Sequence, residues 1–289
     1  MKALGSTKRK GIVWLSSYPR SGNTWTRNFL YNLLSLREGM SDGHNINSLH
    51  EYSLWDIVAA RFEKVLGKPV REASRAEIAA ARAAVQKRIL AEASGPIFVK
   101  THNALVLDQG IPTINMKVTS GAVYIVRNPL DVAISFAHHF GVDIDTAIQR
   151  MNRAGMETDV NEQAVHEVYG SWSQNVMSWT HKQHPTIHVM RYEDMLAAPP
   201  ATFRGLADHL LIDASDEEIC RALDLSSFEK AKAQEKAKGY RERPLLSPAF
   251  FREGRAEQWR DVLSEGQVVR IVEAHREQMA RFDYVPDGL

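Results

Sequence analysis

Short apolar runs alternate with longer helical patterns along this chain of 289 residues. Each run is rich in Val and Ile and too short for a helix, which makes it a candidate strand. Strands of this kind, separated by helical sequence, are typical of a parallel sheet with crossover helices. The pattern therefore predicts an α/β fold in which helices flank a central parallel sheet, with strands at Ile12–Ser16, Ile97–Lys100, Ala122–Val126 and Ile187–Arg191.

The segment between the first two predicted strands is too long for a plain crossover. We expect a helical insertion over 36–95, in which Glu72–Ala93 is helical because it is rich in Ala, Arg and Glu. An insertion of this kind forms a lid, a substrate wall or only packing, and the pattern does not choose among them. No repeat or long linker interrupts the chain, so residues 1–289 are expected to form a single domain.

Composition and charge exclude several classes of protein. The formal net charge of +1 argues against a general nucleic-acid binder, which shows a strong basic excess. Cys220 is the only cysteine, so there is no disulfide framework and no thiolate metal site. We find no apolar stretch long enough for a signal peptide or a membrane span, and we therefore expect a cytoplasmic protein.

Two histidine pairs are the remaining candidates for a metal site. His138 and His139 are adjacent, so on a helix their side chains diverge by about 100°. His181 and His184 are three residues apart, but no carboxylate or cysteine nearby completes a set of ligands. We therefore predict that the protein holds no metal.

The first predicted strand leads through a polar loop into an amphipathic helix. Apolar residues recur at three- and four-residue spacing from Trp25 to Leu34, which indicates the helix. The intervening Pro19-Arg20-Ser21-Gly22-Asn23 favours a sharp turn. A strand, a small-residue loop and a helix start aim backbone N–H groups and the positive helix end at one point, where an anion fits.

The position of the fixed cation indicates which anion fits. In the triphosphate pattern G-x-x-x-x-G-K-[ST], the Lys follows the second Gly and reaches the β- and γ-phosphates. Aligned on Gly22, this chain has Asn23 in place of that Lys, and its cation is Arg20 inside the loop. The sequence thus predicts a phosphate loop without the triphosphate lysine, and a strand-turn-helix with a surface Arg remains the alternative.

The stretch Tyr18-Pro19-Arg20-Ser21-Gly22-Asn23-Thr24-Trp25 resembles the Y-P-[KR]-[SA]-G-[TN]-T-W loop of sulfotransferases that use 3′-phosphoadenosine-5′-phosphosulfate (PAPS). The resemblance implies a P-loop-containing nucleotide-binding fold of the sulfotransferase type. It also implies that the loop wraps the 5′-phosphosulfate and that the Trp packs on the adenine. The residues implied to bind the donor are Arg20, Ser21, Gly22, Asn23, Thr24 and Trp25.

Lys100-Thr101-His102 closes the second predicted strand. Residues just beyond the carboxyl ends of parallel strands face the ligand crevice, so Lys100 and His102 are expected to face whatever the Arg20 loop holds. The segment resembles the family's catalytic segment, in which the His is the general base and the Lys stabilises the transferring group. On this ground we predict His102, Lys100 and Arg20 as catalytic residues.

The third predicted strand runs into the segment Tyr124–Ser135, in which a helix is expected to start at Pro129. Pro129 suits the first helical turn, and Arg127 is a strand-end Arg suited to bidentate phosphate contact. The segment closely resembles the family's 3′-phosphate motif. The resemblance implies that Arg127 and Ser135 hold the ribose 3′-phosphate of the donor.

Three further segments carry weaker resemblances. Tyr169 opens a stretch expected to be helical, and it matches a family tyrosine near the adenine. Ser226-Ser227-Phe228 matches a Thr-Ser-Phe segment that flanks the adenine, whereas Arg191-Tyr192-Glu193-Asp194 matches a segment that is mainly structural. We therefore add Tyr169, Ser226 and Phe228 to the residues predicted to bind the donor.

A basic region over 236–260, punctuated by Gly and Pro, predicts a mobile loop over an anionic ligand. Its last part resembles the R-K-G-x-x-G-D-W-[KR] segment that completes the 3′-phosphate pocket, and Arg252 and Gly254 match. Glu253 replaces the Lys, and an acid beside a phosphate is unfavourable unless it turns away; Arg255 is the candidate to replace the lost charge. The family's dimer motif does not follow, so the oligomeric state is not predicted.

Together these residues predict a PAPS-dependent sulfotransferase. The sulfuryl group moves by in-line attack from PAPS to a hydroxyl or amine of a small-molecule acceptor, and adenosine 3′,5′-bisphosphate (PAP) is the product. In this hypothesis His102 takes the acceptor's proton, while Arg20, Lys100 and the N–H groups of the turn stabilise charge on the leaving 5′-phosphate. The acceptor itself is not indicated by the sequence.

Two other functions fit part of the pattern. A P-loop small-molecule kinase shares the fold and the loop, but it binds Mg-ATP, and Asn23 in the lysine position argues against that. A non-catalytic nucleotide-binding protein keeps Arg127 and Ser135 and has no use for Lys100 and His102, and this chain has all four.

Overall fold

The computed structural model describes residues 10–40, 43–93, 95–244 and 247–289. Residues 41–42 and 94 of the expected insertion, and 245–246 of the expected loop, lie outside the described residues. The chain divides into two compact units. The first contains Met1–Tyr18, Ser53–Tyr124 and Arg153–Val189, and the second contains Pro19–Tyr52, Ile125–Asn152 and Met190–Leu289. The expectation of a single domain over 1–289 stays a prediction.

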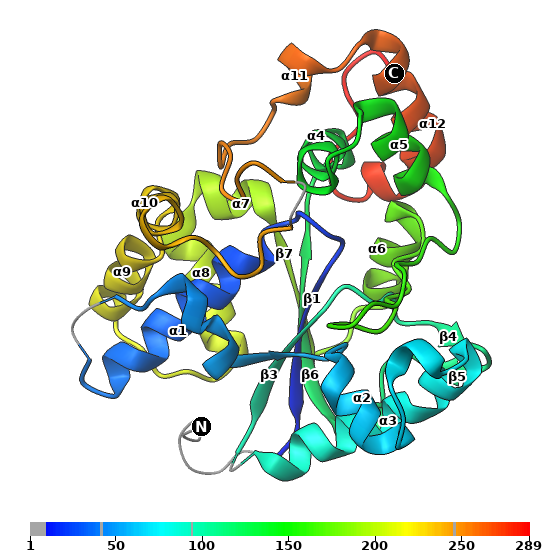
Figure 1. The fold of residues 1–289 in the computed structure, drawn as a ribbon. Coiled ribbons are helices and arrows are strands. Elements are labelled where there is room, and N and C mark those ends of the chain that lie inside the picture. The colour runs from blue at the N-terminus through cyan, green and yellow to red at the C-terminus, as the bar shows by residue number, and fades with distance from the viewer. Residues whose placement is uncertain (1–9, 41–42, 94, 245–246) are drawn as a thin grey trace. The chain divides into compact units, whose positions relative to one another are not determined.

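The first unit carries a five-stranded sheet with the strand order β2-β3-β1-β6-β7 (Figure 1). β1 (Ile12–Ser17) and β2 (Ser53–Trp55) both pair in parallel with β3 (Ile97–Thr101). β6 (Thr119–Val126) and β7 (Ile187–Arg191) begin in this unit, and the last two residues of each belong to the second unit. The α/β class is confirmed, and all four predicted strands are present.

Strand β2 corrects the expectation of a wholly helical insertion. The insertion contains helices α2 (Ala59–Leu66) and α3 (Arg75–Glu92), but Ser53–Trp55 joins the sheet beside β3. Three residues are too few for an alternating pattern to be visible in the sequence. Helix α3 agrees with its prediction from propensity, and it begins at a capping box between Ser74 and Glu77.

The remaining elements of the first unit follow β3. β4 (Leu107–Asp108) and β5 (Ile111–Pro112) form a small antiparallel pair, and α6 (Trp172–Thr180) begins at the N-cap Ser171. Tyr169 was expected to lie in this helix, but it precedes the helix, because the Ser171 side chain caps the helix start two residues later. β1 and β3 are buried at every position, which explains their unbroken apolar runs.

The helices of the second unit pack in two groups (Figure 1). α9 (Asp216–Leu225) packs on α1 (Asn23–Arg37) and on α8 (Pro199–His209), while α5 (Ile144–Asn152) packs on α4 (Pro129–Phe140) and on α12 (Glu265–Ala280). The unit also contains α7 (Tyr192–Ala197), α10 (Phe228–Lys238) and α11 (Trp259–Val262). The expected loop over 236–260 thus begins and ends in helices. No helix among the described residues is long and apolar enough to cross a membrane.

Candidate active site

Gly22 makes the turn of the predicted phosphate loop. It is the N-cap of α1 with φ 105° and ψ 5°, and a Cβ at this position would lie 2.8 Å from Cδ2 of Tyr192. Both facts require glycine. Next to it, the Ser21 hydroxyl is buried and has no hydrogen-bond partner among the described residues. An unpaired buried hydroxyl at the start of a helix suits an anionic ligand.

Arg20 stands in the same loop, with a left-handed φ of 71°. Its guanidinium donates from Nε to Ser135 Oγ at 3.0 Å, from Nη1 to His139 Nδ1 at 3.1 Å and from Nη2 to the Phe250 carbonyl at 3.1 Å. The guanidinium also lies 4.5 Å from the centre of the Phe250 ring. The loop, α4 and the segment before α11 therefore meet at this one cation.

Arg127 belongs to the same cluster of the second unit. Its Nη1 donates to the Arg20 carbonyl at 3.0 Å, and its Nη2 donates to the Arg255 carbonyl at 3.2 Å. Its guanidinium lies 4.3 Å from the centre of the Tyr192 ring. The structure thus brings together Arg20, Arg127 and Ser135, which the sequence placed in two separate motifs.

The charge of this cluster is positive and buried. Burial, and then the charge of Arg127, lower the pKa of Arg20 to about 10, so Arg20 stays protonated at neutral pH. None of the groups that Arg20 bonds is a carboxylate. Because two cations are held close together, a bound anion would relieve their repulsion.

The segment 252–259 is fixed on this cluster by a buried aspartate. Asp131 of α4 accepts the backbone N–H of Glu257 at 2.7 Å and that of Trp259 at 3.1 Å. Glu253 forms ion pairs with Arg252 at 2.5 Å and with Arg255 at 2.8 Å. The acid that replaces the family's Lys therefore contacts both neighbouring arginines.

The other residues predicted near the adenine fall into both units. Trp25 packs on Tyr192, with ring centres 6.3 Å apart, and Phe228 packs under Gly254, where a Cβ would lie 2.5 Å from the ring. Ser226 donates to the Ala222 carbonyl at 2.8 Å at the end of α9. Tyr169 lies in the first unit, and its ring centre is 6.1 Å from that of His102.

Tyr192 is a residue that the sequence reasoning missed as a candidate for the donor site. We interpreted it as structural, yet its ring contacts the Gly22 turn, Trp25 and Arg127. It directly follows β7, just as His102 directly follows β3. The rule that strand ends face the ligand would have identified it.

The second cluster surrounds the end of β3 in the first unit. His102 Nδ1 lies 2.8 Å from the Ser17 carbonyl, and the His102 carbonyl accepts from Asn175 Nδ2 at 3.0 Å. Lys100 lies with its Nζ 4.1 Å from the centre of the Trp55 ring, beside the paired strand β2. His102 is 9% exposed and Lys100 is 7% exposed, so both are held in defined positions.

A separate pocket of about 560 Å³ opens in the first unit. Its lining includes Ala104 and Leu105 after His102, Met177 of α6, and His181 just past the end of that helix. Neither Lys100 nor His102 lines it, so we assign no acceptor to it. No group of three or more His, Cys, Asp or Glu side chains in the described ranges is arranged to hold a metal ion.

Comparison with known proteins defines the class to which this fold and site belong. The sequence profile described as "Sulfotransferase domain" matches residues 10–283. The chain therefore belongs to the sulfotransferase family, and the prediction of a PAPS-dependent sulfotransferase is confirmed at the level of the family. The kinase and binding-protein alternatives are not favoured.

Individual relatives can be aligned with this sequence over most of its length. Luciferin sulfotransferase of Photinus pyralis is 23% identical over 97% of this chain and 75% of its own length. Flavonol 3-sulfotransferase of Flaveria bidentis is 26% identical over 90% of this chain and 78% of its own length. None of these names fixes the acceptor of this protein.

Solved structures share the fold. Retinol dehydratase, in complex with androsterone and PAP, has a TM-score of 0.64 and 22% identity over 94% of this chain and 82% of its own. Mouse sulfotransferase SULT7A1, in complex with PAP, has a TM-score of 0.61 and 20% identity over 96% of this chain and 91% of its own. At these identities the likeness supports the sulfotransferase fold alone.

Proposed function

We propose that this protein transfers a sulfuryl group from PAPS to a hydroxyl or amine of a small-molecule acceptor, with His102 as general base. The observation that carries the proposal is the position of Lys100 and His102 at the end of β3, beside the strand that leads into the Arg20 loop.

The hydrogen bond of His102 supports its role as the base. A carbonyl oxygen only accepts, so the 2.8 Å contact with Ser17 places the hydrogen of the neutral ring on Nδ1. Nε2 is then the ring nitrogen that accepts the acceptor's proton. As the acceptor oxygen or nitrogen bonds to sulfur, the bond from sulfur to the 5′-phosphate oxygen breaks, and the proton moves to Nε2.

The second unit supplies the residues proposed to bind the donor. Ser21 and the Gly22 turn suit the 5′ end, since the unpaired hydroxyl and the helix start both favour an anion. Arg127 and Ser135 are proposed for the 3′-phosphate, as the family motif implies. Arg20 and Lys100 would stabilise the negative charge that forms on the leaving phosphate. Tyr192 is added here to the proposed donor site because it contacts both Gly22 and Arg127.

The adenine contacts are proposed from the resemblance and the packing together. Trp25 and Phe228 present flat aromatic surfaces in the second unit. Tyr169 remains a proposal from the sequence alone, since its ring packs on His102 and its hydroxyl donates to Glu167 at 3.3 Å. Asn23, Thr24, Ser226, Arg252 and Gly254 complete the residues proposed for the donor. Cytoplasmic location is likewise a proposal.

The test is PAP formation from PAPS with a panel of phenols, alcohols and amines. His102→Ala should lower kcat by about 10²–10⁴-fold while the affinity for PAP changes less than twofold, because the base acts only during transfer. His184→Ala is the matched control, since His184 is exposed and bonds only locally to Thr186. Turnover of His102→Ala within twofold of the control would reject the base. Stronger stabilisation by Mg-ATP than by PAP would reject the donor.

A further inference from the structure

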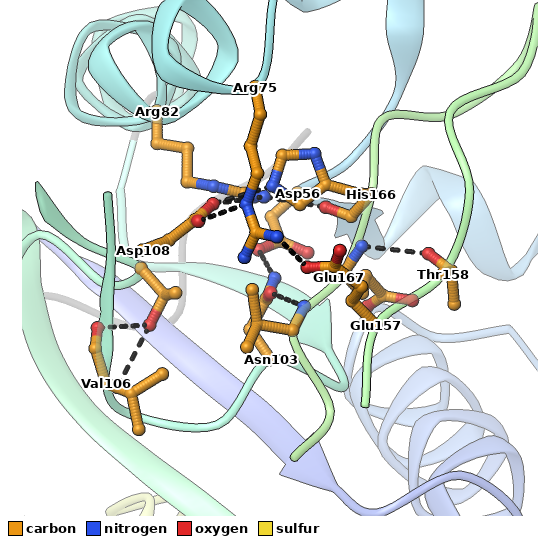
Figure 2. Close-up of polar contacts among 12 residues, drawn as sticks. Asp56, Arg75, Arg82, Asn103, Val106, Asp108, Glu157, Thr158, His166 and Glu167 are labelled. Atoms are coloured by element: carbon orange, nitrogen blue, oxygen red, sulfur yellow. Dashed lines mark hydrogen bonds and ion pairs between the residues drawn. The ribbon is translucent and has the colours of Figure 1, made fainter. Parts of the chain in front are cut away.

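Two buried carboxylates lie behind the strand end that carries Lys100 and His102. Asp56 and Glu167 are 2% and 1% exposed, and they come from segments 111 residues apart. Figure 2 shows Asp56 bonded to Asn103, and Glu167 bonded through its backbone to Thr158. Removing a carboxylate from water costs several kcal/mol unless charges or hydrogen bonds compensate, so the contacts of these two groups are informative.

Asp56 holds the residues on either side of His102. Its Oδ2 accepts from Thr101 Oγ1 at 3.1 Å and from Asn103 Nδ2 at 3.2 Å. Asn103 in turn accepts the Val168 N–H through Oδ1 at 2.8 Å. These bonds fix the path of the chain as it leaves β3.

Glu167 contacts His102 itself. Its Oε1 accepts the backbone N–H of His102 at 2.9 Å, and its Oε2 accepts the Tyr169 hydroxyl at 3.3 Å. The backbone N–H of Glu167 is held by Thr158 Oγ1 at 2.9 Å, a contact that Figure 2 shows. The backbone of Glu167 is therefore held by Thr158, and its carboxylate is held by His102 and Tyr169.

Charged groups of both signs influence Glu167. Burial raises the pKa of Glu167, and the positive charge of Lys100 is the strongest of the influences that lower it. Burial, and then the charge of Glu167, raise the pKa of Asp56 to about 7. The titratable and charged groups that interact with Glu167 from the surrounding segments are Asp56, Arg82, Lys100 and Tyr169, and His102 bonds to it through its backbone N–H.

We propose that Glu167 is a positioning residue for sulfuryl transfer, which fixes His102 by accepting its backbone N–H. The inference rests on the proposed function, since that function gives Lys100 and His102 their roles. A glutamine can still accept the His102 N–H through its amide oxygen, whereas an alanine has no acceptor at this position.

Glu167→Ala removes the acceptor of the His102 N–H, and Glu167→Gln keeps it. We expect kcat to fall at least tenfold in Glu167→Ala and to stay within threefold of the wild type in Glu167→Gln, because the amide oxygen still accepts that N–H. Affinity for PAP should stay within twofold. The assay uses PAPS with the best acceptor of the panel, and again with water as acceptor.

The matched control is Glu157→Ala, the same truncation of a nearby glutamate. Glu157 is partly exposed and pairs with Arg75 at 2.5 Å. We expect it to leave kcat within twofold of the wild type. A kcat of Glu167→Ala equal to that of Glu157→Ala would overturn the proposal.

A further variant keeps the proposal testable if Glu167→Ala does not fold. Glu167→Asp keeps the charge and withdraws the acceptor, so we expect its kcat to fall at least tenfold while that of Glu167→Gln stays near the wild type. The reverse order would overturn the proposal. Calorimetry with PAP on the wild type tests the donor separately, so failure of the inference is distinguishable from failure of the proposed function.

Discussion

Gly22→Ala tests whether the phosphate loop depends on the close approach of Tyr192. The substitution is expected to destabilise the protein for two separate reasons. A left-handed backbone conformation costs an alanine about 1–2 kcal/mol, and φ at Gly22 is 105°. The new Cβ would also lie 2.8 Å from Tyr192 Cδ2, so the ring must move. Displacing a packed ring costs about 1–3 kcal/mol.

Gly39→Ala is the matched control at the other end of the same helix. Gly39 follows the C-cap of α1 with φ 82°, and a Cβ there would meet nothing within 4 Å. Gly39→Ala is therefore destabilised only by the left-handed backbone conformation, by about 1–2 kcal/mol. We expect Gly22→Ala to destabilise the protein by about 2–5 kcal/mol in total, which exceeds the control by the cost of moving Tyr192.

The assay combines urea unfolding with calorimetric titration of PAP. Moving Tyr192 disturbs both the Gly22 turn and the cation–ring contact of Arg127, so affinity for PAP should fall at least tenfold in Gly22→Ala. The control should bind PAP like the wild type. Equal stability and equal affinity of the two variants would refute the reasoning, because the contact with Tyr192 would then have no consequence.

Two other substitutions give sharp outcomes. Asp56→Asn should flatten the pH dependence of the free energy of unfolding. Burial and the charge of Glu167 raise the pKa of Asp56 from 3.8 to about 7. The free energy of unfolding of the wild type is therefore higher at low pH, where Asp56 is protonated, and it falls as the pH rises from about 4 to 7. Over that range, the free energy of unfolding of Asp56→Asn should therefore rise relative to that of the wild type by on the order of 2–4 kcal/mol, as measured by urea unfolding. A difference between the two proteins that does not change with pH would contradict us. Arg255→Ala should weaken PAP binding severalfold if Arg255 replaces the charge of the missing Lys, and unchanged affinity by calorimetry would remove that role. The control is Arg260→Ala, which removes an exposed guanidinium that stacks on Trp259.

The turn from β1 into α1 was predictable because its signal is local. An apolar run, the glycine of a left-handed turn and a helical period follow one another within Ile12–Leu34. The same holds for Lys100 and His102, which were found by their position at the end of a strand. The helix start after Arg127 was marked by Pro129 in its first turn.

The contacts that fix those residues were not predictable, because they join distant segments. Glu167 reaches the His102 N–H across 65 residues, and Tyr192 reaches the Gly22 turn across 170 residues. A single sequence carries no signal for either pairing. Strand β2 was missed for a different reason, since its three residues take their place from pairing with β3 rather than from their own pattern.

The most direct test of the account is whether the protein recognises the 3′-phosphate of its donor. Calorimetry should compare PAP with adenosine 5′-monophosphate, which differs from it only by that phosphate. A charged hydrogen bond contributes about 1.5–3 kcal/mol, so loss of the contacts proposed for Arg127 and Ser135 should weaken binding at least tenfold. Equal affinities for the two nucleotides would contradict the proposed donor site.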